Sequence, residues 1–161
     1  MLVIIPNFVL HVNNCIINVM LKRIMAIDYG ERRIGVAISD PLMLTAQGLP
    51  NIDNDENKFS KIRKLIQDES VSLIVVGMPK NMDGSMGPIA QRVQAFVGEL
   101  KKHVDVPIEY WDERFSTLQA QRHLISLDKS RRKRKNLVDR ISAQIILQGY
   151  LDFLKKDEPD S

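Results

Sequence analysis

The sequence predicts a single α/β domain in which a sheet is layered between helices. Its 161 residues suit one domain with a buried core. Short apolar runs recur along the chain, and from residue 57 onward they alternate with stretches of helical periodicity. The expected order is three strands, helix, strand, helix, strand and two helices. Because such alternation builds parallel crossovers, the last two strands should lie parallel to the first.

The first two strands are predicted as a hairpin, and the other elements follow in order. Residues 21–28 and 33–39 are apolar runs joined by a turn at Tyr29-Gly30. In the first expected helix, 57–69, Phe59 and Ile62 share one face. The remaining expectations are a short strand within 44–52, strands at 71–78 and 106–111, helices at 88–103, 116–126 and 137–154, a loop at 79–87 and a polar, basic loop at 128–136.

Positive charge is concentrated in one short segment. The chain has 23 Lys and Arg against 20 Asp and Glu, a net charge of +3. Six of those basic residues lie within 129–135, so the rest of the chain is slightly acidic. Like charges at this density repel one another, which indicates a docking patch for a polyanion. The candidate phosphate-binding residues in it are Arg131, Arg132, Lys133, Arg134 and Lys135.

The two ends of the chain differ from its middle. Residues 1–21 contain no Lys, Arg, Asp or Glu, but Pro6 and several Asn interrupt the apolar run, so it predicts neither a membrane span nor a secretory signal. We therefore expect an N-terminal extension at 1–20, which an upstream start codon would explain, a folded domain at 21–155 and an acidic tail at 156–161. One cysteine and no zinc-ligand spacing indicate a reducing, cytoplasmic compartment. Because no membrane span is predicted, we expect no membrane partner.

Three carboxylates distant in sequence are candidates for one metal site. Asp28 ends an apolar strand, Glu113 follows the last strand, and Asp139 begins the last helix. Converging carboxylates hold hard divalent cations such as Mg²⁺ or Mn²⁺ against a phosphate. Each residue also has a simpler interpretation: a turn cap for Asp28, a surface ion pair for Glu113 and compensation of the helix dipole for Asp139.

Glu113 rather than its neighbour Asp112 is expected to join this site. Successive strand residues face opposite sides of a sheet, so the two cannot both point to the same cation. If the strand at 71–78 lies between the other two, Asp28 and Glu113 start two strand spacings apart, roughly 10 Å. The longer Glu side chain closes that gap better. Arg114, beside it, is a further candidate for holding a phosphate.

Four sequence blocks follow one another in a recognisable order. The first is Ala-Ile-Asp-Tyr-Gly at 26–30 with Arg-Ile-Gly-Val-Ala at 33–37. The second is Val-Val-Gly-Met-Pro at 75–79 with Asp-Gly-Ser at 83–85. The third runs from Trp111 to Ala120, and the fourth comprises 138–139, 142–143 and 146–148. Together they resemble the YqgF/RuvX family of the ribonuclease H-like superfamily, which includes the Holliday-junction resolvase RuvC, and the resemblance covers about 22–153 without a large insertion.

The resemblance implies a ribonuclease H-like three-layer domain with a five-stranded mixed sheet flanked by helices. It also implies a cytoplasmic role in maturing the 5′ end of the 16S ribosomal RNA precursor, and its acids match Asp28, Glu113 and Asp139. In that reading Asp28 bridges two metals, and Glu113 and Asp139 each complete one coordination sphere. The expected partner is structured precursor RNA, or branched DNA, and the expected state is a monomer or weak homodimer.

Three other functions fit parts of the pattern. A resolvase for branched DNA shares the metal chemistry but usually needs a twofold dimer to cut two strands. An RNA-binding ribosome-assembly factor would keep the basic segment and cut nothing. A sugar-kinase-like ATPase also opens with an Asp-containing hairpin, but such enzymes need two of these domains and 161 residues hold one.

Overall fold

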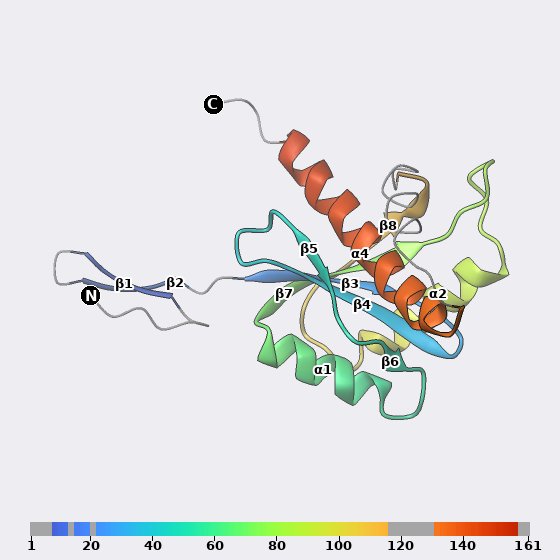
Figure 1. Cartoon of the computed structure of the whole chain (residues 1–161), viewed down its shortest axis with the longest axis horizontal. Coiled ribbons are helices and arrows are strands. Elements are labelled where there is room, and N and C mark those ends of the chain that lie inside the picture. Colours follow the sequence, from blue (N-terminus) through green and yellow to red (C-terminus); the bar gives the residue numbers. More distant parts are fainter. Residues whose placement is uncertain (1–7, 13–14, 20–21, 116–130, 158–161) are drawn as a thin grey trace.

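The computed structural model describes residues 8–12, 15–19, 22–115 and 131–157, and the side chains of 22–114 and 141–156 (Figure 1). The central sheet and its helices account for most of these residues. The elements are β1 (Phe8–Val12), β2 (Cys15–Val19), β3 (Arg23–Asp28), β4 (Arg33–Ser39), β5 (Ala46–Gly48), β6 (Ile52–Asp53), α1 (Lys58–Asp68), β7 (Val71–Met78), α2 (Pro88–Leu100), β8 (Ile108–Asp112), η1 (Glu113–Phe115) and α4 (Arg131–Asp157).

The central sheet is mixed, with strand order β5-β4-β3-β7-β8. Strands β3 and β4 form the expected antiparallel hairpin. Strand β7 pairs parallel to β3, and β8 pairs parallel to β7. These pairings confirm the five-stranded mixed sheet and place β7 between the strands that carry Asp28 and Glu113. A short further strand, β6, pairs with β4 beyond β5 and was not expected.

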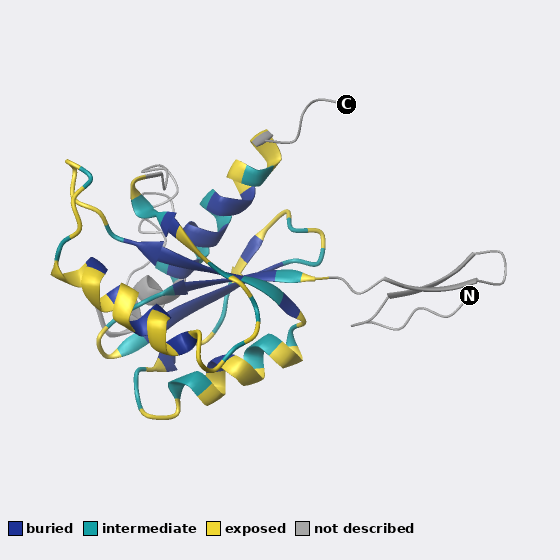
Figure 2. Ribbon diagram, turned by 180° about the vertical axis from the view of Figure 1, so that it is seen from behind, coloured by how far each residue is buried: buried dark blue, intermediate teal, exposed yellow. Residues whose placement is uncertain are grey.

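Helices cover both faces of this sheet (Figures 1 and 2). On one face, α1 and α2 pack against alternate strand residues such as Ile27 and Val76. On the other face, α4 packs against the intervening positions, among them Ala26 and Val75. Figure 2 shows buried strands between helices whose outer sides are exposed. The near-continuous apolar strands follow from this layering, since each central strand is buried on both faces.

A loop between β4 and β5 ties the sheet edge to α4. The carboxylate of Asp40 accepts hydrogen bonds from the backbone amides of Leu42, Leu44 and Thr45, at 3.0, 2.6 and 2.7 Å. The Gln148 side chain of α4 accepts a hydrogen bond from the Ala46 amide, at 3.0 Å, and donates one to the Leu44 carbonyl, at 3.2 Å. The loop therefore fixes the position of the helix that carries Asp139.

Helix α4 begins earlier than the sequence suggested. The basic segment was expected in a loop at 128–136, with the helix starting at 137, but α4 already includes Arg131. The prediction was wrong because it weighed charge repulsion above helix propensity: Arg and Lys are good helix formers, and the segment continues into a packed helix. The helix expected at 116–126 lies outside the described residues.

The other boundaries agree closely with expectation. Strands β4 and β7 have the predicted limits, and α1 lies between its expected ends, with Asn57 and Glu69 at its caps. Helix α2 begins at Pro88, whose fixed φ suits a first helical turn, and ends at Leu100, three residues before the expected end. No helix in the described part of the chain is long and apolar enough to cross a membrane.

The N-terminal extension contains a small hairpin of its own. Strands β1 and β2 pair antiparallel with each other and form a separate two-stranded sheet. In Figure 1 this hairpin projects away from the central sheet. Among the described strands, neither pairs with the central sheet, so the sheet is complete without residues 1–20.

Candidate active site

Asp28 lies at the carboxyl end of β3, on the face of the sheet that α4 covers. Ile24 and Ala26 belong to the apolar cluster on that face, and strand alternation gives Asp28 the same side. Its register partner on β4 is Gly35. A carboxylate at this point ends an otherwise buried strand where the backbone turns towards Tyr29 and Gly30.

Glu113 reaches the same face and the same end of the sheet from η1, directly after β8. Its position is defined by Gly77 of β7, because a Cβ atom on Gly77 would lie only 2.7 Å from Oε1 of Glu113. The same Cβ would lie 2.5 Å from Cδ1 of Ile146 in α4. Gly77 thus leaves the space in which the Glu113 carboxylate lies between β7 and α4.

The strand register places Asp28 and Gly77 at the same level. Ile27 of β3 pairs with Val76 of β7, so the next residues of the two parallel strands are Asp28 and Gly77. Since Glu113 lies over Gly77, the two carboxylate-bearing segments converge on one edge of the α4 face. Strand β7 separates the two segments, and a metal site shared by Asp28, Glu113 and Asp139 stays a prediction.

The surroundings of Glu113 disfavour its charged form. Burial raises the pKa of its carboxyl group, and the negative charge of Asp112 raises it further. A carboxylate with few compensating cations is typical of a site that binds a positive ligand. The donor set therefore fits a hard divalent cation, for which oxygen ligands are preferred.

Asp139 is the ninth residue of α4, in its third turn, and only its backbone is described. It precedes Ala143 by four residues, and Ala143 is fully buried against the sheet. Residues four apart share a face of a helix, which places position 139 on the sheet-facing side. Among the described side chains, which do not include that of Asp139, no group of three His, Cys, Asp or Glu is placed to hold a metal.

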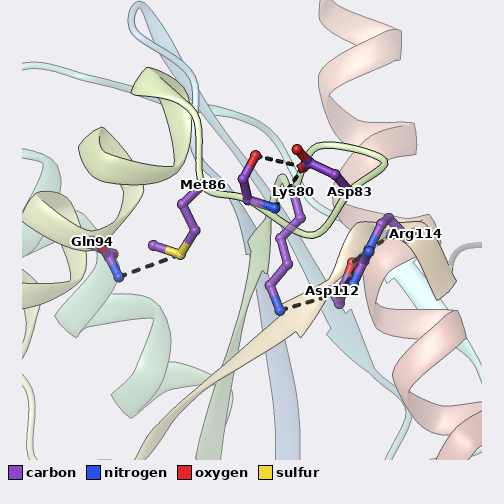
Figure 3. Close-up of polar contacts among 7 residues, drawn as sticks. Lys80, Asp83, Met86, Gln94, Asp112 and Arg114 are labelled. Carbon is purple, nitrogen blue, oxygen red and sulfur yellow. Dashed lines mark hydrogen bonds and ion pairs between the residues drawn. The ribbon is translucent and has the colours of Figure 1, made fainter.

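Asp112 has different partners from Glu113. Its carboxylate pairs with Nη2 of Arg114 at 2.6 Å and with Nζ of Lys80 at 3.4 Å (Figure 3). Hydrogen bonding from Arg114 lowers the pKa of Asp112 to about 2, against an opposing effect of burial. Its register partner Met78 packs in the apolar cluster on the α1–α2 face. The two adjacent acids therefore lie in different surroundings, Asp112 on the α1–α2 face and Glu113 on the α4 face, as strand alternation predicted.

The predicted phosphate-binding residues are only partly described. Arg114 is exposed and pairs with Asp112, so the ion pair considered for this segment does form, although with Asp112 rather than Glu113. The basic positions 131–135 form the first turns of α4, and their side chains lie outside the described part of the chain.

Sequence reasoning missed two residues at this edge of the sheet. Gly77 stood in a quoted motif, but its steric role was not recognised; a glycine inside an apolar strand is a signal for close approach of another group. Lys80 was not considered, because it lies 32 positions before Asp112 in the sequence and nothing local connects the two.

Fold and edge geometry together define a class: a ribonuclease H-like domain with acidic residues at the ends of its central strands. One solved structure of this fold is "T. thermophilus RuvC in complex with Holliday junction substrate". It matches 82% of this chain and 96% of its own, with a TM-score of 0.50 and 13% sequence identity. At that identity the likeness shows the fold alone.

Sequence comparison is more specific. The family model RuvX, described as Holliday junction resolvase, matches residues 22–153. A "putative pre-16S rRNA nuclease" of Halothermothrix orenii is 52% identical over 136 residues, covering 83% of this chain and 97% of the relative. One of the same description from Desulfitobacterium hafniense is 47% identical over 134 residues, covering 83% and 94%. The chain belongs to the RuvX family.

Proposed function

We propose that this chain is a metal-dependent endonuclease that processes the 5′ end of the 16S ribosomal RNA precursor in the cytoplasm. The observation that carries the proposal is the position of the Asp28 and Glu113 segments at one edge of the α4 face, with Gly77 leaving room for the Glu113 carboxylate. The similarity to relatives described as pre-16S rRNA nucleases supports the choice of substrate.

In this proposal the three acids hold Mg²⁺ or Mn²⁺. Asp28 from the end of β3, Glu113 from η1 and Asp139 from α4 would supply the carboxylate oxygens that hold these cations. Bound cations supply activation of a water molecule and stabilisation of the leaving 3′ oxygen. The chain's own contribution is to orient the carboxylates: β3 fixes Asp28, Gly77 admits Glu113, and the packing of Ala143 against the sheet fixes the turn of α4 that bears Asp139.

Positively charged side chains hold the RNA backbone against the edge of the sheet that carries Asp28 and Glu113. Arg114 lies next to Glu113 in sequence, and positions 131–135 precede Asp139 on the same helix. Phosphate contacts of this kind give affinity and register but no base specificity. The substrate should therefore be selected by its shape and by where its single-stranded segments can reach the acids.

The test is cleavage of a 5′-labelled precursor RNA by the purified chain, with and without Mg²⁺ or Mn²⁺. Wild type should cut only with the cation, while Asp28→Asn and Glu113→Gln should lose cleavage by orders of magnitude and keep RNA affinity. Asp68→Asn, an exposed acid of α1 on the other face, is the matched control and should cut normally. Failure of wild type to cut any RNA, with maturation in cells intact in Asp28→Asn, would favour a non-catalytic assembly factor.

A second candidate substrate is branched DNA, and the description of the family model favours it. A four-way DNA junction belongs in the same assay. A resolvase must cut two strands related by symmetry, so it should act as a twofold dimer. Selective, paired cleavage of the junction by a dimeric species would replace RNA by DNA in the proposal, whereas cleavage of RNA by a monomer or weak homodimer would support the ribosomal function.

A further inference from the structure

The carboxylate of Asp112 pairs with two positively charged side chains, Lys80 and Arg114, which come from different segments at the end of the sheet. Arg114 donates from Nε and Nη2 to both carboxylate oxygens, at 2.6 to 3.1 Å, and Nζ of Lys80 lies 3.4 Å from Oδ2 (Figure 3). The Asp112 side chain is 10% exposed, whereas those of Lys80 and Arg114 are 33% and 41% exposed. The carboxylate is thus nearly covered, and the two positive groups face solvent.

The cation pair (Lys80 and Arg114) keeps unused hydrogen-bonding capacity. One carboxylate against two cations leaves a net charge of +1. The Nε and Nη2 groups of Arg114 donate to Asp112. Among the described contacts, Nη1 of Arg114 makes no hydrogen bond or ion pair. Lys80 has three donor hydrogens and one described partner. The geometry suits an anion with several acceptor oxygens, such as a backbone phosphate.

The loop that follows β7 is ordered against this pair. Asn81 and Ser85 bond through both backbone and side chains, at 3.0 and 2.8 Å, and the carboxylate of Asp83 accepts from the hydroxyl of Ser85 at 2.6 Å. Gly84 has a φ of +85°, and Nη1 of Arg114 lies 3.7 Å from where its Cβ would be. A side chain at Gly84 would be strained and would contact Arg114, so the loop leaves this nitrogen accessible.

Stability alone does not account for the arrangement. Ion pairs with exposed partners contribute little to stability, and Asp83, which also attracts Arg114, is fully exposed to solvent screening. The position of the pair is more informative. Asp112 directly precedes Glu113, and Lys80 lies two residues beyond Met78, the register partner of Asp112. The cations therefore lie at the edge of the sheet where the proposed cleavage occurs.

We propose that Asp112 is a positioning residue that presents Lys80 and Arg114 as a preorganised binding site for one backbone phosphate of the RNA. The inference rests on the proposed function and adds Lys80 and Asp112 to the substrate-binding surface. Fixing two long side chains before the substrate arrives removes ordering entropy from binding. Asp112 thus raises affinity although its own charge opposes that of the RNA.

The test is binding of a fluorescently labelled RNA hairpin with a single-stranded 5′ flank, measured in EDTA at several salt concentrations. An Asp28→Asn background prevents cleavage in every sample. Lys80→Gln and Arg114→Gln should each weaken binding roughly tenfold, as expected for one charge-assisted hydrogen bond. Each should also flatten the salt dependence by about 0.7 to 0.9. Lys64→Gln on α1 removes an exposed, ion-paired Lys on the opposite face and should change binding little.

Asp112→Asn separates the positioning role of Asp112 from the effect of its charge, because the two predict opposite changes in RNA affinity. Removing a negative charge should tighten binding to a polyanion, and Asp68→Asn on α1 should show that small gain. Loss of positioning should instead weaken binding several-fold, and Asp112→Glu, which keeps the charge, should restore much of it. If Asp112→Asn fails to fold, Lys80→Gln and Arg114→Gln still test the phosphate site.

Tighter or unchanged binding by Asp112→Asn would overturn the positioning role. Wild-type affinity in both Lys80→Gln and Arg114→Gln would overturn the phosphate site itself. Neither result depends on cleavage. A chain that shows the expected binding pattern but cuts no RNA would therefore contradict the proposed nuclease and leave this inference standing.

Discussion

Gly77 and Glu113 share one space between β7 and α4, and only a residue without a side chain at position 77 lets the Glu113 carboxylate occupy it. A Cβ at Gly77 would lie 2.7 Å from Oε1 of Glu113 and 2.5 Å from Cδ1 of Ile146. Ile146 is buried in the α4 cluster and cannot move freely. The side chain with more freedom is therefore Glu113, and any added volume should displace it.

We expect Gly77→Ala to reduce cleavage strongly and to destabilise the fold by about 1–3 kcal/mol, the usual range for overpacking. Single-turnover cleavage and urea unfolding measure the two effects. Gly98→Ala is the matched control, because apart from the neighbouring backbone of α2 itself no atom lies within 4 Å of the Cβ it would add; it should stabilise by about 0.5–1 kcal/mol. Normal cleavage and stability in Gly77→Ala would show that Glu113 is not held as described.

Most of the fold could be predicted from the sequence, because the patterns that indicate strands and helices are local. The apolar run of β7 predicted a central strand, and alternation separated Asp112 from Glu113. The steric role of Gly77 could not be predicted in the same way, because it depends on contact with residues from η1 and α4, which are distant in the chain. The ion pair of Lys80 with Asp112 is likewise a tertiary contact between the segments after β7 and at the end of β8.

The basic segment shows the limit of reasoning from charge. Repulsion among neighbouring cations argued for a loop, but the helix continues through Arg131. The backbone of positions 131–135 is therefore continuous with the helical turn that carries Asp139.

Neutralising Arg131, Arg132 and Arg134 to Gln should weaken binding of all RNA sequences alike, because phosphate contacts carry no sequence information. The salt slope should flatten by about 0.7 per lost contact on a single strand and 0.9 on a duplex. The triple variant Lys61→Gln, Arg63→Gln and Lys64→Gln on α1 makes the same change in net charge on the opposite face. Equal losses in the two triple variants would mean that only net charge matters.

Asp40 should make folding stability depend on acid pH. Burial opposes ionisation of its carboxyl, but hydrogen bonds from the amides of Thr45, Leu44 and Leu42 outweigh that effect and lower its pKa from the ordinary value of 3.8. These bonds therefore stabilise the fold above that value, and their contribution is lost as the pH falls through the lowered folded-state pKa. Asp40→Ala should cost about 1–3 kcal/mol at pH 7.

The measurement for Asp40 is urea unfolding at pH 7 and at several pH values below 4. The difference between wild type and Asp40→Ala should shrink towards the acid end. Asp83→Ala is a suitable control, because Asp83 also accepts hydrogen bonds but in a loop that does not hold α4. A difference between wild type and Asp40→Ala that stays constant with pH would mean that the bonds to the ionised carboxylate are not its source.

Residues 1–19 should be dispensable for the fold of the central domain. Strands β1 and β2 pair with each other and with no strand of the central sheet among the described residues. A chain starting at Met20 should therefore unfold at the same urea concentration as the full chain and bind RNA equally well.

A chain starting at Met25 is the contrasting variant, because it also removes Arg23 and Ile24. Ile24 is buried and its amide donates to the Ser39 hydroxyl at 2.9 Å, while Arg23 pairs with Glu69 at 3.0 Å. Burial of one large aliphatic side chain contributes about 1.5–3 kcal/mol, so this shorter chain should be clearly less stable. A loss of several kcal/mol in the chain starting at Met20 would show instead that the hairpin is part of the folded core.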